Sequence, residues 1–148
     1  MPYDARELFA RLIQCEAGGE GEDGMRAVAS VIMNRVNIPY GEFARVSQGG
    51  NLRNIIEQPG QFVCMRDYVE GRPNTQNVWN MTPSDIHFEI ADWAIQGGRL
   101  VGVDDSLFFY NPYSNECPPY FPPGGIGVIQ TRVNQHCFYR PTEKYKDT

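Results

Sequence analysis

The chain has 148 residues, a net charge of −5 and 41% hydrophobic residues. This length fits one domain over residues 1–148, and the apolar content is sufficient for a folded core. The acidic balance argues against a nucleic-acid-binding protein, which needs a basic surface, and against adsorption to anionic lipid by charge alone.

The N-terminal residues show no basic segment followed by an apolar one, so no secretory signal is expected. No apolar run approaches the ~20 residues that span a bilayer, so no membrane span is expected. The first predicted element is an amphipathic helix over residues 4–17, where apolar side chains recur at intervals of three and four. Asp4 is expected to cap its start, and Gly18-Gly19 are expected to end it, because glycine adopts the left-handed conformation at little cost.

A second helix is predicted over residues 22–36. Its middle, AVASVIM, is apolar on nearly every face, so this helix is expected to be buried and central. The segment 37–50 is rich in glycine and has the composition of a loop, whereas residues 51–57 are expected to form a short helix. A polar excursion follows at residues 66–81.

The C-terminal half is expected to contain one more helix and then a sheet. The helix is predicted to begin after Thr82 as its N-cap and to end before Gly97. Strands are predicted at residues 107–110, 127–132 and 136–140. The fold class is therefore α+β, with a mainly helical core and a small antiparallel sheet in the C-terminal half.

The cysteines and histidines form no recognisable metal site. None of the four cysteines is in a CxxC pair, and the two histidines are isolated, so neither a metal nor a cofactor is expected. Cys15 lies in an apolar helix and is expected to be a buried free thiol. Cys117 and Cys137 lie in proline-rich and turn-rich sequence, where a disulfide is compatible with the pattern. His87 is expected to lie at the surface or in packing.

Four carboxylates gather between the first two helices. Glu16 continues the apolar stripe of the first helix, because it lies four residues after Leu12, and burial of a carboxyl group raises its pKa. A glutamic acid with a raised pKa suits the general acid of glycoside cleavage, although a residue at a helix end can also extend into solvent. Glu22 and Asp23 suit the positive end of the second helix. Glu20 is either a cap or a supporting carboxylate.

A family resemblance follows from ARLIQCEAGGE and GMRAVASVIMNRV, with GQF, LFFYNP and HCFY in that order. The ordered set resembles the SleB/CwlJ-type spore-cortex-lytic cell wall hydrolases of spore-forming bacteria. The chain resembles the catalytic domain alone of these proteins, and it is more similar to the CwlJ-like branch. The resemblance spans nearly the whole chain and implies a fold related to lysozyme-like lytic transglycosylases. The catalytic glutamate of the family's E-A-x-G-E motif corresponds to Glu16, and its second glutamate to Glu20.

Further residues are predicted to hold a glycan strand, because polysaccharide clefts use aromatic faces and amide or hydroxyl groups. These residues are Gln61, Phe62, Tyr110, Asn111, His136 and Tyr139. Tyr110 and Asn111 have alternatives as a core residue and as a turn residue before Pro112. For His136 the favoured alternative is a structural histidine.

The expected function is cleavage of spore-cortex peptidoglycan during germination. The expected reaction is lytic transglycosylation, in which one glutamate acts as acid and then as base and leaves 1,6-anhydro-muramyl ends. Three alternatives stay open. They are a hydrolytic muramidase or glucosaminidase, a wall amidopeptidase that uses Cys15 or Cys64 with His136, and a non-catalytic peptidoglycan-binding coat protein.

The resemblance also implies partners and a location. These are cortex glycan strands that contain muramic-δ-lactam, a spore-coat partner protein, activation by calcium–dipicolinate, and a place in the spore coat after synthesis in the mother-cell cytosol. The residues themselves show no site for calcium or dipicolinate. The excursion 66–81 and the proline-rich segment 117–125 are expected to form cleft walls or partner surfaces.

Overall fold

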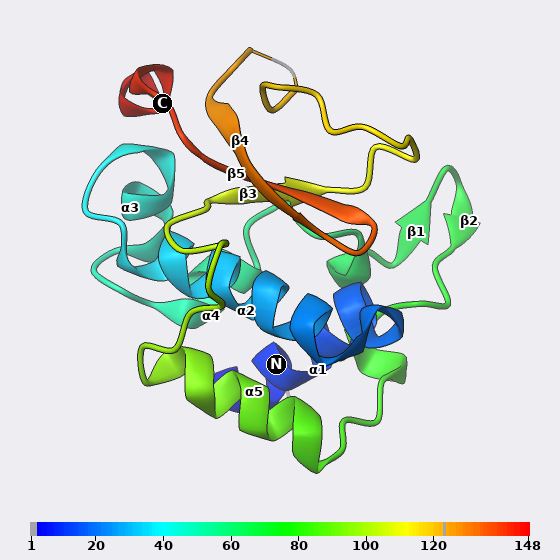
Figure 1. Cartoon of the computed structure of the whole chain (residues 1–148). Helices are drawn as coiled ribbons and strands as arrows, with labels where there is room; N and C mark the ends of the chain where they lie inside the picture. The colour runs from blue at the N-terminus through cyan, green and yellow to red at the C-terminus, as the bar shows by residue number, and fades with distance from the viewer. Residues whose placement is uncertain (1–2, 123) are drawn as a thin grey trace.

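A helical layer and a small antiparallel sheet make up the fold (Figure 1). The computed structural model describes residues 3–122 and 124–148, so residue 123 of the proline-rich segment lies outside them. The helices are α1 (Ala5–Ala17), α2 (Gly21–Asn37), α3 (Gly41–Ser47), α4 (Leu52–Ile56) and α5 (Asp85–Ile95). The strands are β1 (Tyr68–Val69), β2 (Arg72–Pro73), β3 (Phe108–Tyr110), β4 (Gly127–Val133) and β5 (His136–Pro141). Within these described ranges, no helix is long and apolar enough to cross a membrane.

Helix α1 begins and ends where the sequence predicts, but the backbone after its end has a different conformation. The Glu7 backbone N–H donates to Asp4 Oδ1 at 2.8 Å, which confirms the cap. The helix ends at Ala17, directly before Gly18-Gly19 as predicted, but the predicted left-handed conformation is wrong, because the φ of Gly18 is −58°. The chain instead tightens into a 3₁₀ turn, η1 (Gly18–Glu20), and the left-handed residue is Gly21. Only this short turn therefore separates α1, with Glu16 as its penultimate residue, from α2.

Helix α2 is the centre of the molecule, as predicted. Figure 1 shows it between the sheet and α5, and it contacts α1, α5, β3 and β4. Arg35 near its end is only 5% exposed. The Arg35 Nε–H donates to the Leu107 carbonyl at 2.8 Å, and the guanidinium lies 4.5 Å from the ring centroid of Phe43. These contacts tie the helical layer to the start of β3.

The glycines of segment 37–50 predicted a loop, and this prediction is wrong, because the segment contains α3. Tyr145, from the far end of the chain, stabilises the start of this helix. Its hydroxyl accepts from the Phe43 N–H at 3.0 Å and donates to the Tyr40 carbonyl at 3.1 Å. Gly41 has a φ of +78°, and a Cβ there would lie 2.5 Å from the Tyr145 ring. A contact between residues about a hundred positions apart is invisible to a local pattern.

Helix α5 is capped by Ser84 rather than by the predicted Thr82. The Ser84 N–H donates to Nδ1 of His87 at 2.9 Å, so this histidine takes the place that glutamate or glutamine has in an ordinary capping box. His87, expected at the surface or in packing, thus has a local structural role. The helix buries Ile90 and Ala94 against the core.

The three-stranded sheet has the strand order β3–β5–β4, with both pairs antiparallel, and β1 and β2 form a separate antiparallel pair. This late sheet behind a helical layer confirms the α+β prediction. In the register, Phe108 pairs with Tyr139 and Tyr110 with Cys137. Because side chains alternate along a strand, these four share one face, whereas His136 and its neighbours Phe109 and Phe138 share the other.

All four cysteines are in disulfides, Cys15–Cys64 and Cys117–Cys137. The first disulfide shows that the prediction of a free thiol at Cys15 is wrong. It forms because the 3₁₀ turn η2 (Val63–Met65), which carries Cys64, lies against the end of α1, which carries Cys15. The second confirms the bridge that the sequence allowed. A cysteine-dependent amidopeptidase would need a thiolate at Cys15 or Cys64, and this structure offers neither.

The two disulfides should differ in their effect on stability. Cys15–Cys64 closes a loop of 49 residues and Cys117–Cys137 one of 20. Loop-closure entropy then predicts a loss of free energy of unfolding of about 4 kcal/mol for the Cys15→Ser/Cys64→Ser variant and about 3 kcal/mol for Cys117→Ser/Cys137→Ser. Urea unfolding of both variants and of the oxidised wild type measures the difference. A larger loss from the second pair would contradict the expected order.

Candidate active site

A cavity of about 550 Å³ opens where the end of α1 meets η2 and the turn between β4 and β5. It is lined by Gln14, Cys15, Glu16, Gly18, Gly19, Glu20, Val63, Cys64, Asn74, Gln76, Asn111, Tyr113, Gln135 and His136. Both glutamates of the E-A-x-G-E motif therefore reach one cavity. Its walls come from segments that are far apart in the sequence.

Glu16 lies on the last turn of α1 and is partly exposed to this cavity. Burial raises the pKa of Glu16 to about 7, and the positive charge of Arg35 acts in the opposite direction. Among the residues that the structure describes, none donates a hydrogen bond to its carboxyl group. The exclusion of water thus keeps a substantial share of Glu16 protonated near neutral pH, which suits a proton donor.

Glu20 is held by the hairpin of β4 and β5. Its Oε1 lies 2.9 Å from Nδ1 of His136 and accepts from the Gln135 N–H at 3.2 Å. The Glu20 carbonyl also accepts from Nδ2 of Asn134 at 2.5 Å. His136, favoured as a structural histidine from the sequence, therefore both anchors this turn and lines the cavity.

Four predicted residues lie in the sheet or directly after β3, and they divide between its two faces. Asn111 and His136 line the cavity, whereas Tyr110 and Tyr139 do not. Tyr139 is fully buried, and its hydroxyl donates to the Pro118 carbonyl at 2.9 Å. Strand alternation explains the division, because Tyr110 and Tyr139 share the opposite face with Cys137.

Gln61 and Phe62 also lie away from the cavity lining. Phe62 is 3% exposed and packs with its ring centroid 5.5 Å from the Arg35 guanidinium. The Gln61 Oε1 accepts from Nη1 of Arg35 at 3.2 Å. These two residues help to hold the buried arginine whose charge acts on Glu16.

Several cavity residues were not predicted individually. Asn74 and Gln76 come from the excursion 66–81, which agrees with its expected role as a cleft wall. The Nε2 of Gln76 donates to the Cys15 carbonyl at 3.1 Å, next to Glu16. Their only signal in the sequence is the amide-rich stretch NTQN. Tyr113 follows the turn at Asn111 and Pro112, but no periodic pattern marks it.

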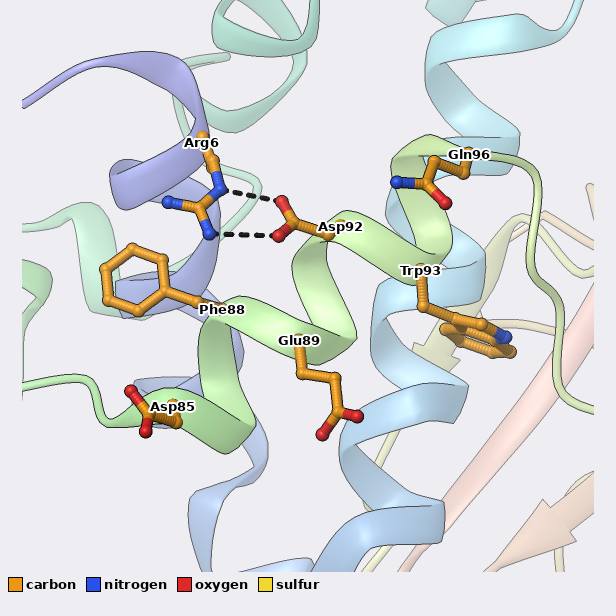
Figure 2. A pocket seen from close by; sticks show the side chains of 7 residues that line it. All are labelled: Arg6, Asp85, Phe88, Glu89, Asp92, Trp93 and Gln96. Atoms are coloured by element: carbon orange, nitrogen blue, oxygen red, sulfur yellow. Dashed lines mark hydrogen bonds and ion pairs between the residues drawn. The ribbon is translucent and has the colours of Figure 1, made fainter.

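A larger hollow of about 670 Å³ lies between α1 and α5, and Figure 2 shows its lining. Arg6 reaches across from α1 and donates to both carboxylate oxygens of Asp92, at 2.6 and 2.9 Å. The hydrogen bond from Arg6 holds the pKa of Asp92 below its ordinary value. Asp92 is therefore unsuited to donate a proton, and the cavity at Glu16 is the candidate active site. Within the described part of the chain, no three histidine, cysteine, aspartate or glutamate residues form a group that could hold a metal ion.

Comparison with known sequences gives one consistent result. A family model described as Cell Wall Hydrolase matches residues 19–139, which includes Glu20 and begins three residues after Glu16. The chain is 30% identical over 138 residues to the cell wall hydrolase CwlJ of Bacillus subtilis (strain 168), covering 92% of this chain and 84% of that protein. It is also 30% identical to CwlJ of Oceanobacillus iheyensis, with 92% and 86% covered.

Solved structures agree on the fold. The catalytic domain of the germination-specific lytic transglycosylase SleB from Bacillus anthracis matches with a TM-score of 0.63 and 21% identity, over 94% of this chain and 98% of that domain. The SleB catalytic domain of Bacillus cereus matches with a TM-score of 0.65 and 23% identity, over 92% and 89%. At these identities the likeness shows a shared fold.

The raised pKa of Glu16 should make the free energy of unfolding depend on pH. The pKa rises from 4.5 in the unfolded chain to about 7 in the folded protein, so the ionised carboxylate costs folding free energy above pH 7 and the protonated one costs none below pH 4.5. The Glu16→Gln variant should therefore be more stable than the wild type at pH 8, by up to about 3 kcal/mol, and equally stable at pH 4. Urea unfolding at both pH values tests this, with Glu22→Gln as the control. Equal stability of Glu16→Gln and wild type at pH 8 would contradict the burial argument.

Proposed function

Because the chain belongs to the cell wall hydrolase family, we propose that it cleaves the glycan strands of peptidoglycan and that Glu16 is its catalytic acid. The observation that carries the proposal is a glutamate with a pKa of about 7 in a cavity. The family match itself begins after Glu16, so the assignment rests on this geometry and on the motif. At neutral pH a substantial share of such a group is protonated and able to donate.

The proposed reaction needs only one carboxyl group. Neutral Glu16 donates its proton to the glycosidic oxygen as the bond from that oxygen to C1 of the muramic-type sugar breaks. The C6 hydroxyl of the same sugar then attacks C1, and its proton passes to the Glu16 carboxylate. The product is a 1,6-anhydro ring, no water is consumed, and Glu16 is again protonated for the next turnover.

The contacts of Glu20 favour this reaction over hydrolysis. A hydrolytic glycosidase ordinarily uses a second carboxylate as a base or a nucleophile. Here Oε1 of Glu20 is engaged with His136 and with the Gln135 N–H. SleB, whose catalytic domain shares the fold, is itself a lytic transglycosylase. The hydrolytic alternative is distinguished by its products, because water attack leaves new reducing ends.

The proposed substrate is the peptidoglycan of the spore cortex, and the proposed location is the spore periphery. SleB is described as germination-specific, and the CwlJ relatives are named cell wall hydrolases. Two disulfides in so short a chain are typical of an oxidising environment rather than of a reducing cytosol. The muramic-δ-lactam requirement, the coat partner protein and activation by calcium–dipicolinate stay predictions from the family resemblance.

Glu16→Gln should abolish cleavage while leaving the fold intact. The amide keeps the shape of the side chain but has no acidic proton, so the rate of fragment release from purified cortex should fall roughly a thousandfold or more. Mass spectrometry of the wild-type digest should show anhydro-muramyl ends. Full activity of Glu16→Gln would remove Glu16 from the mechanism, and reducing ends alone would favour hydrolysis.

Glu20→Gln should reduce the rate less than Glu16→Gln does. An amide can still accept a hydrogen bond from His136, so the turn is weakened but not released. We expect a loss of about tenfold in kcat/KM, which corresponds to about 1.4 kcal/mol. Losses of equal size from the two variants would indicate a mechanism with two carboxylates.

A further inference from the structure

We propose that Tyr113 is a stacking platform for one sugar ring of the glycan strand at the mouth of the cavity. This inference rests on the proposed function and assigns a binding subsite to it. Three features of Tyr113 support the platform: the exposure of its ring, the conformation of the backbone that carries it, and the attachment of the loop on which it lies.

The Tyr113 side chain lines the cavity and is 90% exposed. A single exposed aromatic ring is common on protein surfaces, so exposure alone would say little. Here the ring belongs to a cavity whose other lining includes the amide side chains of Gln76 and Gln135. Flat aromatic faces next to amide groups match a pyranose ring, whose C–H face is apolar and whose rim is polar.

The backbone at Tyr113 is held in an unfavourable conformation. Its φ is +52°, in the left-handed region that bulky side chains rarely adopt. The Tyr113 N–H donates to Oδ1 of Asn111 at 2.8 Å, which stabilises this turn. Glycine would take the same conformation without strain, so a tyrosine is not explained by the turn itself. Strain of this kind gathers at ligand-binding sites.

The loop is attached to the sheet although the ring is exposed. Arg132 of β4 donates from Nη2 to the Ser114 carbonyl at 2.8 Å. The Cys117–Cys137 disulfide joins the end of the loop to β5, one residue after His136. The backbone that carries the ring is therefore held relative to the pair of His136 and Glu20. A loop that is already ordered binds a sugar with a smaller loss of conformational entropy than a mobile one.

The test uses the Glu16→Gln protein as the parent, so that a bound glycan is not cleaved. Its affinity for muramic acid–glucosamine oligosaccharides prepared from cortex is measured by NMR titration. Adding Tyr113→Ala should weaken binding about tenfold, whereas Tyr113→Trp should stay within about threefold of the parent. Tyr120→Ala removes another exposed tyrosine outside this cavity and should leave the affinity unchanged.

Stability separates a platform from a structural ring. Tyr113→Gly should lose the same affinity as Tyr113→Ala, yet its thermal midpoint should be no lower than that of the parent, because glycine relieves the strained φ. In the active protein, Tyr113→Ala should raise KM with little change in kcat.

Two results would overturn the platform in different ways. If the parent binds the oligosaccharide and Tyr113→Ala binds it equally well, the platform is wrong and the proposed function stands. If the parent binds no glycan and the wild type releases no fragments, the proposed function fails and the platform fails with it.

Discussion

The burial of α2 is the constraint on which the other elements depend. A helix that is apolar on nearly every side must be covered on every side, so the sheet covers one flank and α1 with α5 the other (Figure 1). Because α1 runs directly into α2 through a turn of three residues, its last turn lies at the edge between the two layers. Glu16 is thus taken partly out of water by the same packing that forms the core, and its raised pKa is a by-product of the architecture.

Hydrogen bonds also join the turn between α1 and α2 to the sheet. The Glu20 side chain contacts the tip of the β4–β5 hairpin at His136 Nδ1 and at the Gln135 N–H, more than a hundred residues away in the sequence. Gly24, one turn into α2, leaves room for this contact, since a Cβ there would lie 2.4 Å from Cβ of Glu20. The two glutamates of one short motif therefore have opposite environments. Glu16 lacks hydrogen-bond donors among the described residues, and Glu20 is surrounded by them.

Local patterns predicted most elements of the fold but only part of the site. The helical spacing of apolar residues predicted α1, α2 and α5 and predicted that Glu16 points inward, because the residues of a buried stripe recur every three or four positions. The helix α3 was missed because Tyr145 stabilises it from the far end of the chain. In the site, alternation along β3 and β5 would have separated Asn111 and His136 from Tyr110 and Tyr139 had the pairing been known. Gln76 and Tyr113 lie on loops, where no period exists to mark them.

The two disulfides that connect the cavity walls can form only after the chain has been synthesised. One joins the helix of Glu16 to the wall at η2, and the other joins the loop of Tyr113 to the strand of His136. A newly made chain carries four thiols, and each bridge forms only when an oxidant has removed two electrons and two protons. The walls of the cavity are consequently locked by a chemical event that follows synthesis. A chain can then leave the ribosome with its motif complete, while these two cross-links between the cavity walls form only where an oxidant is present.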